Sequence, residues 1–125
     1  MKIYSSEKTF RVLSYNISHK TLYLRSMRGA NQPLNIDIIF FGVFYIQIPE
    51  RIEGVSLTMN EIDRKVEERI HVFIDRNYMK VFNLFDNSVD AVIGATGVKI
   101  YENNMFPLEL KTFDEPLINN LIYEM

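Results

Sequence analysis

Residues 36–48 read Ile-Asp-Ile-Ile-Phe-Phe-Gly-Val-Phe-Tyr-Ile-Gln-Ile, and this stretch decides how the chain folds. Every even-numbered position except Gly42 is apolar, whereas the odd-numbered positions are polar at both ends and apolar in the middle. Because successive side chains of a strand point to opposite faces, a period of two indicates a strand. We therefore predict a central strand that is buried along one face and at the centre of the other. Gly42 predicts a bulge or bend, since the segment is long for one flat strand.

Other segments with alternating polarity predict further strands on both sides of this one. They cover residues 9–15, 21–27, 52–57, 78–85 and 89–101. Residues 16–20 are turn-forming, so the first two of these strands are predicted to pair as a hairpin.

Two segments change to a helical period. Apolar residues recur every three to four positions over residues 60–70, and Asn60 is a suitable N-cap. Residues 115–124 follow a capping Asp114, have a proline in the first turn and again show helical spacing. The sequence thus predicts a β-rich α+β fold. It would be an antiparallel sheet or partial barrel of about five to seven strands, with short helices near 60–70 and 115–124.

Length and composition indicate one domain that spans residues 1–125. Hydrophobic residues make up 47% and charged residues 24%, which is typical of a globular protein. The absence of cysteine excludes a disulfide scaffold, a thiol nucleophile and any zinc site built on sulfur. The N-terminus lacks an apolar signal-peptide core, and the longest apolar run is too short for a membrane helix. We expect a soluble, cytoplasmic protein with no membrane partner.

Charge is distributed unevenly along the chain, although the formal net charge is only −2. Residues 1–28 hold six Lys or Arg and one acid, whereas residues 81–125 hold two Lys and seven acids. One interpretation is that the two ends lie close together and partly neutralise each other. The other is a dipolar surface that steers a charged partner. We favour the first, because such asymmetry is common in short chains.

The segment Val-Ile-Gly-Ala-Thr-Gly at residues 92–97 resembles the glycine-rich turn of nucleotide-binding Rossmann domains. That turn needs a third small residue and a following helix, but Ile100 is large and residues 98–101 alternate like a strand. We therefore predict a bulge or kink in a strand here, and no cofactor.

No constellation of residues points to a reaction. His19 and His71 have no second ligand at metal spacing, so no metal site is expected. No serine lies in a nucleophile motif. The sequence therefore predicts that the protein is not an enzyme.

The N-terminal hairpin favours one alternative, a module that binds single-stranded nucleic acid. Arg11, Tyr15, Tyr23 and Arg25 are predicted to share one face of it, and aromatic rings with basic neighbours are typical of such binding. Against this, the sequence pI is near 5.7, whereas dedicated nucleic-acid binders are usually basic. Nucleic acid is therefore not our first choice of partner.

Aromatic content favours the leading hypothesis, a protein–protein interaction module. Nine Phe and seven Tyr exceed what we would place in a core of this size, so some should reach the surface and contact a protein partner or a second copy. A narrower version is an inhibitor or immunity-type protein whose acidic residues Asp86, Asp90 and Glu102 face a basic partner. A further alternative is a β-barrel that binds a small apolar ligand.

Overall fold

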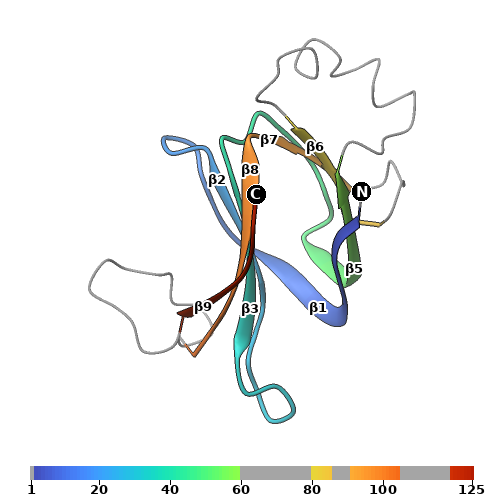
Figure 1. Cartoon of the computed structure of the whole chain (residues 1–125), viewed down its shortest axis with the longest axis vertical. Helices are drawn as coiled ribbons and strands as arrows, with labels where there is room; N and C mark the ends of the chain where they lie inside the picture. Colours follow the sequence, from blue (N-terminus) through green and yellow to red (C-terminus); the bar gives the residue numbers. More distant parts are fainter. Residues whose placement is uncertain (1, 60–79, 86–90, 105–118) are drawn as a thin grey trace.

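The computed structural model describes residues 2–59, 80–85, 91–104 and 119–125 (Figure 1). Within these ranges, nine strands pair antiparallel in one sheet with the order β4-β7-β6-β5-β1-β2-β3-β8-β9. The strands are β1 (Lys2–Asn16), β2 (Thr21–Ser26), β3 (Asn35–Phe41), β4 (Tyr45–Gln47), β5 (Arg51–Met59), β6 (Lys80–Asn83), β7 (Val92–Ala95), β8 (Gly97–Asn103) and β9 (Asn119–Glu124).

The alternating segment that opens at Ile36 forms β3, which lies inside the sheet between β2 and β8. Ile38 and Phe40 are fully buried on one face, and Ile39 is 9% exposed at the centre of the other. The predicted central strand is therefore confirmed for β3, and so is the hairpin of β1 and β2. It is wrong for the second half of the segment, because β4 lies at the edge of the sheet and Ile46 is 37% exposed. Burying one face fixes the register, because a slip by one residue would move every apolar side chain to the opposite face.

Two neighbouring corners bend the long strands. Gly42 has a φ of +64°, and the chain leaves β3 there before it resumes as β4. A Cβ at Gly42 would overlap the side chain of Thr96, which lies at the corner between β7 and β8. The backbone N–H and the hydroxyl of Thr96 both donate to the Phe41 carbonyl, each at 3.0 Å. The predicted bend at Gly42 and the predicted kink within residues 92–97 are thus confirmed, and they form one shared corner.

These corners let the sheet curl around its own apolar face. β4 continues β3 and β8 continues β7, so each bent strand contributes to two regions of the sheet. Figure 1 shows the result, with β5 and β6 on the right of the view, β8 near its middle and β9 at the lower left. Phe40 of β3 and Phe82 of β6 meet edge to face across the core, with ring centroids 5.4 Å apart. Strands that are distant in the order of the sheet therefore pack against each other.

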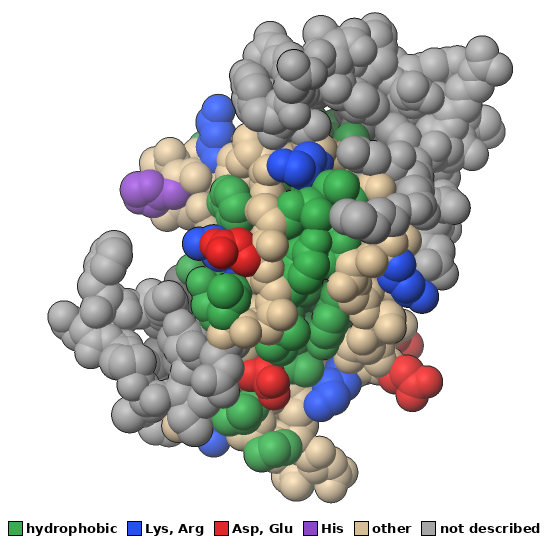
Figure 2. Space-filling model, viewed as in Figure 1, with side chains coloured by type: hydrophobic (Ala, Val, Ile, Leu, Met, Phe, Trp, Pro, Cys, Tyr) green, Lys and Arg blue, Asp and Glu red, His purple; other side chains and the backbone are tan. Residues whose placement is uncertain are grey.

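The core fills the concave face of this curled sheet. Its buried members include Phe10, Leu24, Ile52, Leu57 and Ile93. Figure 2 shows hydrophobic side chains in a band down the middle of one face, between the side of β8 and that of β5. The core is therefore continuous with a partly open margin, where half-buried apolar side chains pack against it: Ile3, Tyr4, Val12, Ile48, Met59, Phe85, Tyr123 and Met125.

The prediction of an α+β fold is wrong, because the described part of the chain is all-β and contains no helix. The helix expected over residues 115–124 is contradicted by β9, which pairs with the outer edge of β8. That edge carries unpaired backbone groups, and a strand satisfies them whereas a helix cannot. The helix expected over residues 60–70 lies outside the described residues. The sheet is also larger than the five to seven strands that were expected. The described residues contain no helix that is long and apolar enough to cross a membrane.

Candidate functional site

The surface of interest is the outer face, which we define as the side of β5, β1, β2, β3 and β8 turned away from the core. Side chains of residues directly opposite each other in a sheet lie on the same face. The register pairs Arg51 with Arg11, Arg11 with Arg25, Arg25 with Asp37, and Asp37 with Tyr101. One row across five strands therefore carries three arginines, a carboxylate and a tyrosine.

A buried ion pair lies at the centre of this row. The guanidinium of Arg25 donates from Nε to Asp37 Oδ1 at 2.6 Å and from Nη2 to Oδ2 at 2.9 Å. The two side chains are 0% and 2% exposed, so both charges are withdrawn from water. Asn103 Nδ2 also donates to Asp37 Oδ2 at 2.8 Å, and Asn35 Nδ2 donates to Asn103 Oδ1 at 2.9 Å. This network fixes the side chains that separate two grooves.

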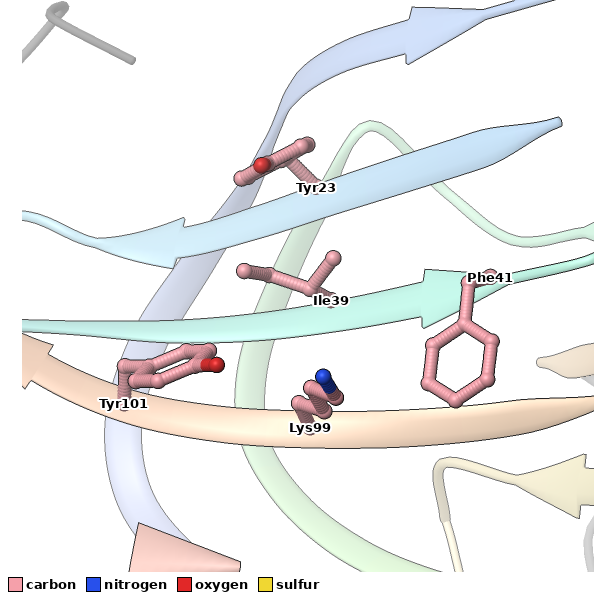
Figure 3. A pocket seen from close by; sticks show the side chains of 5 residues that line it. All are labelled: Tyr23, Ile39, Phe41, Lys99 and Tyr101. Carbon is pink, nitrogen blue, oxygen red and sulfur yellow. The ribbon is translucent and has the colours of Figure 1, made fainter. Parts of the chain in front are cut away.

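The first groove, which we call the aromatic groove, has a volume of about 280 Å³ (Figure 3). It lies over β2, β3 and β8 and is lined by Tyr23, Ile39, Phe41, Lys99 and Tyr101. Lys99 Nζ lies 3.1 Å from Glu124 Oε2 and 5.8 Å from the centre of the Phe41 ring. The groove thus offers an apolar floor, two phenols and a cation at its rim.

Two groups in the aromatic groove have shifted pKa values. Burial is the main cause that raises the pKa of Tyr23, and the nearby Asp37 and Tyr101 raise it further, while Arg25 opposes them. The hydrogen bond to Glu124 is the main cause that raises the pKa of Lys99. At neutral pH Tyr23 is therefore a neutral phenol and Lys99 is a cation. Both can donate hydrogen bonds to a ligand.

The second groove, which we call the arginine groove, has a volume of about 450 Å³. It is lined by Thr9, Arg11, Arg25, Met27 and Arg51. Arg51 Nη2 lies 3.3 Å from Glu53 Oε1, but both side chains are more than half exposed, so this pair is weak. Among the described residues, no acidic group forms an ion pair with the exposed Arg11. Like charges directly opposite each other destabilise a sheet, so this row is unusual without an anionic ligand.

The structure brings together three of the four residues of the predicted nucleic-acid face. Arg11, Tyr23 and Arg25 lie on the outer face, but Tyr15 does not, because it pairs with Leu22. A register shift between Val12 and Ser14 moves Tyr15 to the other side. Arg25 is also not available as a surface charge, since it is buried against Asp37.

Of the three acidic residues predicted to face a partner, the structure describes only Glu102, which is not on the outer face. Glu102 lies in β8 opposite Ile36, whereas Asp86 and Asp90 lie outside the described residues. Glu102 is close enough to Tyr4 to raise its pKa, although burial is the main cause of that increase and a hydrogen bond with Ser6 opposes it. Whether the three acidic residues form one surface therefore stays a prediction.

Sequence reasoning did not identify the other residues of the two grooves. Alternation in β3 and β8 predicts which face each side chain occupies, but not that the two strands are neighbours. Only their pairing in the structure brings together Phe41, Lys99 and Tyr101. Arg51 lies next to Arg11 only through the pairing of β1 with β5. In the described ranges, no three His, Cys, Asp or Glu side chains gather to hold a metal.

No protein-family model, curated protein or solved structure matches this chain. The chemistry of the outer face is therefore the basis for a functional proposal.

Proposed function

We propose that this protein is a non-enzymatic binding module that recognises a protein partner through its outer face. The observation that carries the proposal is that the aromatic groove and the arginine groove lie side by side on one face of the same sheet. Tyr, Phe, Met and Arg are the residues enriched at protein interfaces. An apolar pocket beside charged groups is what an anchoring side chain of a partner requires.

The division of apolar residues between the two sides of the sheet supports this function. The concave face already has a filled core, which includes Ile38 and Phe40 but not Ile39. Ile39 and the partly buried Phe41 instead line the aromatic groove together with the two tyrosines. These side chains are thus not needed to complete the core, and contact with a partner would remove the exposed parts of Phe41 and the two tyrosines from water.

The protein would act in the cytoplasm, and its partner would be an enzyme that it blocks, as inhibitor or immunity-type proteins do. Small size, the absence of a catalytic motif in the sequence and a preformed outer face favour an inhibitor. Binding of a small apolar ligand stays a separate prediction.

Binding of single-stranded nucleic acid is the second candidate. Arginines that lie in register beside three aromatic rings favour it, because bases stack on rings while cations contact the backbone. Two facts weigh against it. The formal net charge is −2, and the charge of Arg25 is balanced by Asp37. A protein partner is therefore the better choice.

Affinity purification with matched variants tests the proposal. The full chain would be incubated with nuclease-treated extract of the source cells, next to Tyr101→Ala and the control Tyr15→Ala. Tyr101 lines the aromatic groove, whereas the exposed Tyr15 lies on the opposite side of β1. We expect one stoichiometric protein with the wild type and the control, and at least tenfold less with Tyr101→Ala, because an interface anchor contributes more than about 1.4 kcal/mol.

The captured protein would then be purified and bound again by the same three chains, after thermal melts have verified that each is folded. Equal binding by Tyr101→Ala, or retention of nucleic acid alone from extract without nuclease, would contradict the proposal.

A further inference from the structure

We propose that the arginine groove binds the carboxylates of an acidic segment in the partner, so this inference rests on the proposed function. Directly opposite residues in neighbouring strands have Cβ atoms about 5 Å apart. Arg51, Arg11 and Arg25 occupy such positions on β5, β1 and β2. Three arginines therefore occupy neighbouring positions in one row, and their charges repel one another wherever no anion balances them.

The three arginines differ in what already balances their charge. Arg25 is held by Asp37 in a buried bidentate pair, so it forms a fixed wall of the groove. Among the residues that the structure describes, Arg51 forms an ion pair only with the exposed Glu53, and a partner's carboxylate can replace Glu53 at little cost. Arg11 lies between them, exposed and without an ion pair among the described residues. The middle of the row is thus the position at which an anion gains most.

The chemistry of the side chains favours carboxylates. A guanidinium matches a carboxylate with two parallel hydrogen bonds, and such charge-assisted pairs are the strong ones. Thr9 adds a hydroxyl to the lining of the groove, and Met27 adds an apolar wall. A long nucleic-acid backbone would extend beyond the groove over the rest of this protein, whose formal net charge of −2 repels phosphates. A short acidic peptide segment would contact the groove alone.

Strand geometry defines the segment further. Two strand spacings, about 10 Å, separate β5 from β2 across the groove. In an extended segment, side chains at i and i+2 share one side and lie about 7 Å apart. Two acids separated by one residue would therefore reach Arg11 and Arg51 together. The Arg25–Asp37 pair lies between the two grooves, so an apolar anchor near these acids would enter the aromatic groove.

A titration followed by amide NMR shifts tests this inference, because it detects weak binding. The full chain at low salt would receive a short peptide of alternating glutamate and serine, the same peptide with glutamine, or an oligothymidylate. We expect the glutamate peptide to bind, with shifts on β1, β2 and β5, and the glutamine peptide not to bind. Arg11→Gln should weaken binding about tenfold, the value of one lost charge-assisted hydrogen bond.

Two further variants make the result specific. Lys8→Gln removes the same charge from an exposed position of β1 that does not line the groove, so it should weaken binding far less. Arg11→Lys should recover only part of the affinity, because an ammonium cannot form the bidentate pair. No binding of the glutamate peptide, equal effects of Lys8→Gln and Arg11→Gln, or tighter binding of oligothymidylate would overturn the inference. If the purified partner still depends on Tyr101 but not on Arg11, the inference fails while the proposed function stands.

Discussion

Replacing Asp37 by asparagine should reveal how far the outer face depends on its buried ion pair. Asparagine keeps the size of the side chain but removes the negative charge that faces Arg25. One carboxylate oxygen becomes an amide group, which presents its own donors to a guanidinium that has only donors. Because Arg25 is 0% exposed, water cannot replace the lost partner. The substitution therefore removes the carboxylate that balances the buried charge of Arg25.

The magnitude follows from the geometry of the pair. Asp37 accepts two hydrogen bonds from Arg25, at 2.6 and 2.9 Å, and a third from Asn103. Removing one partner of a buried pair costs about 3–5 kcal/mol. A domain of this size is typically stable by about 5–15 kcal/mol, so the loss is a large share of the free energy of unfolding. The melting temperature should decrease by roughly 10–20 °C.

Urea unfolding followed by circular dichroism measures this loss. The double variant Arg25→Met with Asp37→Asn should regain most of the stability, because it removes the stranded charge and keeps an oxygen for Asn103. As a control, Glu53→Gln breaks the exposed pair with Arg51 and should change the free energy of unfolding by less than about 0.5 kcal/mol. A loss below about 1 kcal/mol for Asp37→Asn, or a double variant no more stable than the single one, would refute the reasoning.

Three further predictions concern other parts of the sheet. Gly42→Ala should cost about 1–3 kcal/mol in urea unfolding, because φ is +64° and the new Cβ would overlap Thr96; equal stability would contradict the shared corner. The pKa of Tyr23 is raised above 10.0, so its contribution to the free energy of unfolding is fully present below pH 10.0 and is lost as pH rises through the raised pKa. The free energy of unfolding of Tyr23→Phe should therefore decrease less over that pH range than that of the wild type. Parallel curves of unfolding free energy against pH for the two proteins would count against burial as the cause. Glu102→Gln should lower the pKa of Tyr4 in a phenolate absorbance titration, and an unchanged value would show that the two groups do not interact.

Local patterns in the sequence were sufficient where one segment decides its own structure. The alternation around Phe40 predicts β3, and Gly42 predicts the bend, because both depend on neighbouring residues alone. The last strand was different. Its apolar residues suit a helix as well as a strand, and the exposed edge of β8 decides between them. Only the folded sheet supplies that edge, so tertiary pairing overrides the local preference.

The outer face shows the same limit. A predicted hairpin with regular alternation puts Tyr15 beside Tyr23, but the bulge near Leu13 reverses its side, and no residue type in the sequence marks that bulge. The meeting of Arg11 with Arg51, and of Arg25 with Asp37, depends on the register of strands that are far apart in the chain. The sequence thus shows which residues are charged, but not which of them lie next to each other in the sheet.

The corner shared by Gly42 and Thr96 also restricts how the length of this chain can change. Both long strands turn at neighbouring points, and Phe41 accepts hydrogen bonds from across the corner. Inserting one residue into either bent strand would shift its bend by one residue, so Gly42 and Thr96 would no longer lie opposite each other. Every side chain after the insertion would also move to the opposite face of the sheet. Extra residues, new termini or a fused peptide therefore belong in the turn at residues 17–20, where the chain reverses at the surface.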